Sequence, residues 1–279
     1  MVKLYLKLLI VGAIVAQEIW TLPDDYTKLH IRKKRLVNRI PGGNQPTRIE
    51  QAPHLVSVHL NNNHTCSGTI LYSNVILVMA DCVHLNEPHT YKVISGTNRR
   101  DAGTTHNVLK IAYHPEYYPS EGDMGNMALL EINPPIDLVH SPNRKIALYY
   151  GNLSPNTVVQ TSGWGDNRLD RRPHPILLRT ITVPTISTEL CKSLNNNDPL
   201  ITEAVICTHD TTLQQHACDG DESNPLNDLE NRYLYGIMLW TRGRGFPDVY
   251  LNLSYPDYKA WIVPEIVRIA SKRPLLRAP

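Results

Sequence analysis

The chain has 279 residues, of which 42% are apolar and 19% are charged. This length is enough for one large domain or two small domains with a proper core, and the composition is ordinary for a globular protein. The formal net charge is +2, from 28 Lys and Arg against 26 Asp and Glu, so no strong electrostatic field attracts nucleic acid. We expect no nucleic-acid partner, no cofactor and no metal site.

Residues 1–16 have the pattern of a secretory signal peptide. Lys3 and Lys7 precede the apolar run LLIVGAIVA, and Ala16 is a small residue suited to cleavage. The run is short for a membrane span, which leaves an uncleaved anchor as the weaker alternative. No later segment is long and apolar enough to cross a bilayer. The sequence therefore predicts a secreted, extracellular protein.

Residues 17–39 form a basic stretch without apolar periodicity. They include the run RKKR at 32–35, which is typical of convertase cut sites, and a second candidate bond between Arg39 and Ile40. A solvated charge run is the alternative. Because the stretch lies between a signal peptide and a globular block, we interpret it as a processed pro-segment, with cleavage after either Arg35 or Arg39 left open.

The region from about Pro53 to Tyr255 is predicted to be rich in β-strands. Short apolar runs bounded by Gly, Pro, Asn and Asp recur along it, among them HLVSVHL, MALLEI, TVVQTSGW, YLYGIMLW and DVYLNL. Their spacing favours antiparallel barrels or a sandwich. Only the segment YPDYKAWIVPEIVRIASKR has helical periodicity, and we assign residues 265–279 to a basic tail that is either solvated or in contact with anionic glycans or membranes.

Several segments in order resemble one known family. They are RIPGGNQPTRIEQAPHLVSVHL, CSGTILYSNVILVMADC, GNMALLEI, SGWG, CDGDESNPL, YGIMLW, PDVYLNL and YKAWI. Together they are similar to trypsin-like (chymotrypsin-fold, S1-type) serine proteases, from about Ile40 to Val263. The resemblance implies an all-β fold of two packed antiparallel six-stranded β-barrels with a C-terminal helix, and we place the peptidase S1-like domain at 40–264.

The resemblance implies a catalytic triad that is degenerate at all three positions. In the family's motifs, the histidine directly precedes the second cysteine of the segment that corresponds to CSGTILYSNVILVMADC. The aspartate lies two residues before the run ALL, and the serine follows Gly-Asp. Here these positions hold Asp81, Asn126 and Glu222. The nearby His84, Asp123 and Ser223 are out of register, so the resemblance implies that no positioned base and no activated hydroxyl remain. We therefore expect no enzyme activity.

The resemblance also implies a changed specificity pocket. His216 stands where the trypsin branch has an acid, and Leu239 replaces a serine before the pocket's Trp240. Thr241 and Asp248 occupy positions that are usually glycine, so their side chains should block the pocket. His216 and Asp248 are either an ion pair or two partly hydrated polar residues.

Some features of a functional family member remain. Gly220 matches an oxyanion glycine, Asp221 matches the acid that pairs with a new N-terminal amine after activation, and His64 matches a histidine that holds this acid beforehand. Ile40 would supply the amine. Pro41 follows it, however, and proline puts cleavage at Arg39 and insertion of Ile40 in doubt.

Secretion gives the five cysteines a role in disulfides, and an odd number leaves one unpaired or joined to another chain. The resemblance implies the pairs Cys66–Cys82 and Cys191–Cys207. Cys218 is then free or forms a dimer, because the loop between Trp240 and Pro247 lacks its usual partner. Secretion also makes three Asn-X-Ser/Thr sequons candidates for glycosylation, at Asn63, Asn152 and Asn252.

Our sequence-based hypothesis is a catalytically inactive homologue (a pseudoprotease) that acts as a cofactor or decoy. Its partners would be extracellular proteins such as proteases or protease inhibitors. Relatives with degraded triads occur in insect secretions, including immune and reproductive fluids. One alternative is a residual or rewired hydrolase, in which Asp81 and Glu222 act as an acid/base pair. Another is a cation site formed with Asn126, and the simplest is drift of unused residues to polar side chains.

Overall fold

The computed structural model describes residues 46–119, 124–165, 176–212, 216–217 and 220–271. These residues all belong to one compact unit, Val37–Pro279. The predicted signal peptide, the pro-segment, Ile40, Asp123 and Cys218 lie outside the described residues. Among the described residues, no helix has the length and apolarity that crossing a membrane requires.

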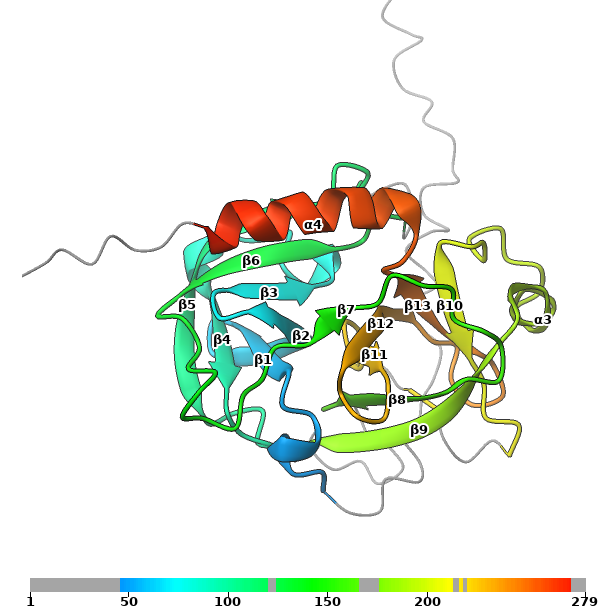
Figure 1. Cartoon of the computed structure of the whole chain (residues 1–279), viewed down its shortest axis with the longest axis horizontal. Coiled ribbons are helices and arrows are strands. Elements are labelled where there is room, and N and C mark those ends of the chain that lie inside the picture. The colour runs from blue at the N-terminus through cyan, green and yellow to red at the C-terminus, as the bar shows by residue number, and fades with distance from the viewer. Residues whose placement is uncertain (1–45, 120–123, 166–175, 213–215, 218–219, 272–279) are drawn as a thin grey trace, which may run out of the picture. The chain divides into compact units, whose positions relative to one another are not determined.

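The first half of the described chain forms a closed antiparallel barrel (Figure 1). Its strand order is β1-β2-β3-β6-β5-β4, and its strands are β1 (Leu55–Leu60), β2 (Asn63–Tyr72), β3 (Val75–Val78), β4 (Tyr91–Ser95), β5 (Thr104–Tyr113) and β6 (Ala128–Asn133). β3 is the sequence VILV and is buried throughout, as expected for a β-branched run inside a closed sheet. Gly68 of β2 allows β3 to approach closely, because a Cβ there would lie 2.8 Å from the Ile76 side chain.

The second half forms another barrel, in which β11-β8-β9-β10-β13-β12 closes through pairing of β11 with β12. The short β7 adds to β12 in parallel. The strands are β7 (Ala147–Leu148), β8 (Val158–Gly163), β9 (Arg179–Ile186), β10 (Val205–Thr208), β11 (Pro225–Asn227), β12 (Tyr233–Trp240) and β13 (Asp248–Asn252). The predicted pair of six-stranded antiparallel barrels is therefore confirmed. β9 shows the period of two that its sequence predicts, with Ile181, Val183 and Thr185 buried.

Two helices complete the described fold. The short α3 (Thr188–Leu194) begins after Ser187, whose side chain accepts a hydrogen bond from the Leu190 N–H. The C-terminal helix α4 (Pro256–Ala270) packs on β2, β3 and β6 and buries Ile262 and Ile269. The helix corrects our placement of the tail at 265, because the apolar face continues through Ile269 and keeps the chain helical to Ala270.

Disulfides Cys66–Cys82 and Cys191–Cys207 are present, the pairs that the resemblance implies. The first joins β2 to the 3₁₀ helix η3 (Ala80–Cys82), and the second joins α3 to β10. The largest cluster of buried apolar side chains includes members of both barrels, such as Val56 and Leu251. One core therefore supports the polar cluster around η3 that is described next.

Candidate functional site

Asp81 and Asn126 are brought together by the pairing of β3 with β6. Asp81 lies in η3 just after β3, and Asn126 lies just before β6, whose Ala128 pairs with Val78. The Asn126 side chain accepts a hydrogen bond from the Asp81 N–H (3.0 Å) and donates one to the Asp81 carboxylate (2.9 Å). Tyr117 donates its hydroxyl to the other carboxylate oxygen at 2.7 Å. Uncharged donors thus orient Asp81 at both oxygens.

His84 is half-buried beside this carboxylate. Its Nδ1 lies 3.0 Å from the Asp81 carbonyl oxygen and 3.8 Å from the Asp81 carboxylate. The His84 ring also packs edge-on against Tyr117, with ring centroids 6.0 Å apart. These contacts place His84 beside Asp81 and not at the position of the family's histidine, which Asp81 holds.

Glu222 turns its carboxylate back on its own loop. Its Oε2 accepts a hydrogen bond from the Gly220 N–H at 2.7 Å, and Gly220 has a φ of 91°. The family resemblance matches Gly220 to the glycine whose N–H stabilises the oxyanion, the negative charge that develops on the carbonyl oxygen during acyl transfer. The Glu222 carboxylate occupies that donor.

Ser223 is fully buried, so its hydroxyl does not face solvent. Its Oγ accepts a hydrogen bond from the Met79 N–H at 3.0 Å, and its own N–H donates to Met238 at 2.9 Å. Its φ of 71° lies in the left-handed region, which serine rarely adopts. The hydroxyl is therefore a structural link between the two barrels.

Asp221 has no exposed surface, and its side chain packs so closely on Gly165 that no larger residue fits at position 165. Its Oδ1 accepts hydrogen bonds from the Gly165 N–H (2.9 Å) and the Asn224 side-chain amide (2.6 Å). A Cβ at Gly165 would lie 2.1 Å from the Asp221 side chain. His64 has described contacts with the Ser57 hydroxyl (2.7 Å) and the Trp164 ring (5.9 Å).

The blocked pocket is a polar, nearly filled space in the second barrel. Asp248 is buried and accepts hydrogen bonds from the Ala217 N–H (2.7 Å) and the Thr241 hydroxyl (2.6 Å). Burial raises the pKa of Asp248, against the opposing effect of these two hydrogen bonds and of His216. Of the alternatives left open, the ion pair does not form among the described residues: His216 Nδ1 lies 2.7 Å from the Ala217 carbonyl oxygen.

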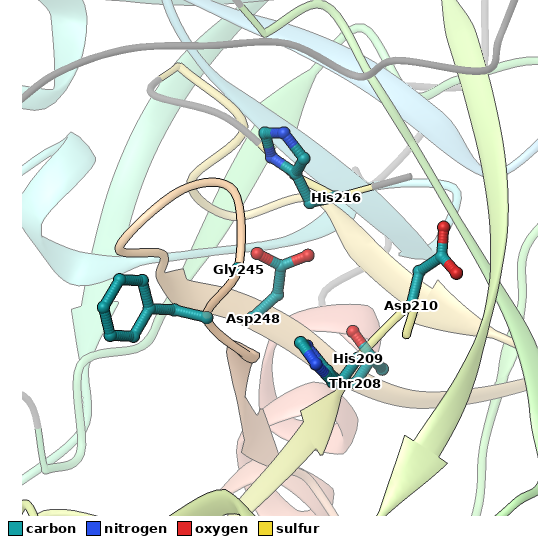
Figure 2. A pocket seen from close by; sticks show the side chains of 7 residues that line it. Thr208, His209, Asp210, His216, Gly245 and Asp248 are labelled. Atoms are coloured by element: carbon teal, nitrogen blue, oxygen red, sulfur yellow. The ribbon is translucent and has the colours of Figure 1, made fainter. Parts of the chain in front are cut away.

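Little room remains beside Asp248. The cavity there has a volume of about 10 Å³, which is about the space of one water molecule. Figure 2 shows the Asp248 carboxylate pointing toward the side on which His216 lies, with His209 and Asp210 nearby. Leu239 is buried in the core, and its aliphatic side chain has no hydrogen-bonding group for Asn126, the residue at the position of the family's aspartate.

An ion pair lies next to Trp240, at the end of β12. Arg242 pairs with the buried Asp198 at 2.8 Å, and its guanidinium lies 5.4 Å from the centroid of the Trp240 ring. Arg242 therefore links the Trp240 ring to the segment before β10. Within the described ranges, no group of three or more His, Cys, Asp or Glu side chains is arranged to hold a metal ion, so the cation site considered from the sequence gains no support.

Comparison with known proteins identifies the family. The family model described as Trypsin matches residues 40–262. The chain belongs to the trypsin family. It is 30% identical over 242 residues to Trypsin zeta of Drosophila melanogaster, covering 80% of this chain and 84% of that protein. It is 26% identical over 246 residues to the Vitellin-degrading protease of Bombyx mori, covering 86% and 90%.

Solved structures agree with this trypsin-family fold. The scabies mite inactivated protease paralogue S-D1 matches with a TM-score of 0.70 and 24% identity, over 83% of this chain and 98% of that one. Mouse neuropsin matches with a TM-score of 0.68 and 20% identity, over 78% and 96%. At these identities the likeness establishes the fold alone.

Four residues of this trypsin-family site were missed from the sequence. Tyr117 binds Asp81, Asn224 binds Asp221, and Arg242 pairs with Asp198 beside Trp240. Asn224 was the one with a usable signal, because it lies three positions after Asp221 in the quoted CDGDESNPL. The others depend on loop conformations that sequence patterns do not encode.

Proposed function

We propose that this chain is a secreted, non-catalytic member of the trypsin family that acts by binding extracellular proteins. The observation that carries the proposal is the hydrogen bond from the Gly220 N–H to the Glu222 carboxylate, at 2.7 Å. In acyl transfer a serine hydroxyl attacks the carbonyl while backbone N–H groups stabilise the oxyanion. Glu222 supplies no hydroxyl at this place, and its charge competes with any oxyanion for Gly220.

The neighbouring groups support the same conclusion. A general base must lie within hydrogen-bond reach of the proton it takes. Asp81 is instead bound by Asn126 and Tyr117 at 2.9 and 2.7 Å, and the Ser223 hydroxyl is buried on the Met79 N–H. Among the described contacts of these groups, none joins a nucleophile to an oriented base.

The closed pocket argues against a substrate side chain entering. Thr241 and Asp248 are hydrogen-bonded to each other at 2.6 Å, and the remaining volume is about 10 Å³. This volume is about that of one water molecule, which leaves no room for a substrate side chain of several heavy atoms. A role that uses the outer surface needs no such space. We therefore propose protease or protease-inhibitor partners, recognised on the surface.

The proposal is tested by turnover of the mature protein, cut after Arg39, on a panel of peptide and ester substrates. We expect no turnover above background. Glu222→Ser alone should also be inactive, because Asp81 and Asn126 remain and triad members act as a unit. The triple variant Asp81→His, Asn126→Asp, Glu222→Ser is the matched comparison. Substrate turnover by the unmodified chain, abolished in Glu222→Ala, would instead support a rewired hydrolase.

A further inference from the structure

Strand β5 is paired unequally on its two sides. It pairs with β6 from Asn107 to Tyr113, but with β4 only from Thr104 to Asn107. On the β4 side, the edge from 108 to 113 has no strand partner in the described part of the chain, and the 3₁₀ helix η4 (Pro88–Thr90) packs against β5 before β4 begins. The open part of the edge therefore lies toward Ile111 and Tyr113. An unpaired edge presents a row of backbone N–H and C=O groups, a template on which another extended chain can pair.

The free side of β5 can be identified from one hydrogen bond. The His114 N–H donates to the Met127 carbonyl oxygen at 3.0 Å, so His114 faces β6. Backbone groups of an antiparallel strand alternate between its two sides. Ala112 therefore also faces β6, while Ile111 and Tyr113 face away from it. No backbone hydrogen bond from Ile111 or Tyr113 to another described segment accompanies this orientation.

A groove lies along this free edge. It has a volume of about 550 Å³, with Ile111 and Tyr113 on one wall and the segment 84–90 on the other. Such a volume falls within the range of ligand sites in proteins, roughly 300–1,000 Å³. Leu85 is 76% exposed and offers apolar surface on the second wall. The Tyr113 hydroxyl donates to the Val83 carbonyl oxygen at 2.9 Å and links the two walls.

The charge of the groove favours a basic occupant. Glu87 is exposed on the second wall, and among the described residues no Lys, Arg or His forms an ion pair with it. A Lys or Arg of an incoming segment would lie next to this carboxylate. Leu85 and Ile111 would contact an apolar side chain at a neighbouring position of the same segment.

We propose that the β5 groove binds an extended segment of a partner protein by strand addition. The segment pairs its backbone with Ile111 and Tyr113, places an apolar side chain between Leu85 and Ile111, and meets Glu87 with a Lys or Arg. Strand addition gives affinity through main-chain hydrogen bonds and specificity through side-chain contacts. This inference rests on the proposed binding function, and it specifies the surface that binds and the class of partner.

Amide hydrogen exchange of the full chain, read by NMR, tests the open edge. We expect the Ile111 and Tyr113 amides to exchange at least about tenfold faster than those of Ala112 and His114, because only the latter are held by β6. Equal protection of all four amides in the free protein would show that the edge is already covered and would overturn the proposal.

The probe for binding is the peptide acetyl-Val-Lys-Val-Thr-Val-amide. Its matched control carries N-methyl groups on alternate amides, so it keeps the side chains but cannot pair as a strand. We expect the unmodified peptide to slow exchange at Ile111 and Tyr113, the control to fail, and Glu87→Gln to weaken binding roughly two- to fivefold, as for an exposed ion pair. Absence of binding, equal binding of the control, or no effect of Glu87→Gln would each overturn the proposed site.

These outcomes are distinct from those that test the absence of catalysis. A peptide that binds the groove of a chain that also turns over substrate overturns the proposed function and keeps the site. An inactive chain that binds no peptide overturns the site and keeps the absence of catalysis.

Discussion

His54 is a buried residue whose protonation should be visible in stability. It is 1% exposed, and burial lowers its pKa from 6.5 to about 4, against the opposing effects of the nearby Asn227 side chain and the charge of Asp228. A depressed pKa contributes stability above pH 6.5 that is lost as the pH falls toward 4, because the unfolded chain takes up the proton first.

The free energy of unfolding should therefore fall by roughly 3 kcal/mol more in the wild-type chain than in His54→Gln between pH 7 and pH 4. Denaturant unfolding at several pH values measures this difference. His89→Gln, an exposed replacement, is the matched control and should behave as the wild type. Parallel pH curves for His54→Gln and the wild type would contradict the assignment.

The three sequons differ in how the folded chain can carry a glycan. Asn63 and Asn152 are exposed. The Asn252 side chain is half-buried, donates to the Glu203 carbonyl oxygen at 2.9 Å and accepts from the Ser254 N–H at 3.1 Å. We predict glycans at Asn63 and Asn152 but not at Asn252 in protein from a secreting cell, as glycopeptide mapping would reveal. A fully occupied Asn252 would be contrary to this prediction.

The buried carboxylate of Asp221 holds the turn from Gly220 to Asn224. Asn224→Ala removes one of the two described donors to Asp221 and should lower the free energy of unfolding by roughly 1.5–3 kcal/mol, the range for hydrogen bonds to charged groups. Asn86→Ala, on the exposed segment 84–90, is the control and should change stability little. Denaturant unfolding of both variants gives the comparison, and equal stabilities would show that Asn224 does not hold the turn.

Most elements were predictable because their signals are local. The alternation in β9 and the apolar runs of β3 and β12 are present in the sequence itself. Of the two partners of Asp81, Asn126 was expected nearby from the family resemblance, although it lies 45 residues away. Tyr117, 36 residues away, was not predictable, because no motif connects it to Asp81. The open edge of β5 is likewise a property of strand register, which the sequence does not specify. The helical spacing of the segment that became α4 was also visible in the sequence, and only the start of the basic tail, placed at 265, falls inside the helix.

At the scale of the whole molecule, two barrels share a core and meet where Ser223 of one binds Met79 of the other. Under the proposed function, the fold is kept while the groups for acyl transfer are lost, which agrees with the general independence of fold and function. The free energy of unfolding should depend on the two disulfides as well as on the core. Replacing Cys191 and Cys207 with Ala should cost about 3 kcal/mol, the loop-closure value for about 15 residues, measured by denaturant unfolding.

The central claim is that the former catalytic region has no reactive nucleophile. Labelling with a fluorophosphonate, followed by intact mass and peptide mapping of the protein cut after Arg39, tests it most directly. An active trypsin-family protease serves as the positive control. The account predicts no added mass on this chain, because Glu222 occupies the Gly220 N–H and the Ser223 hydroxyl is buried. A stoichiometric adduct on Ser223 would contradict it.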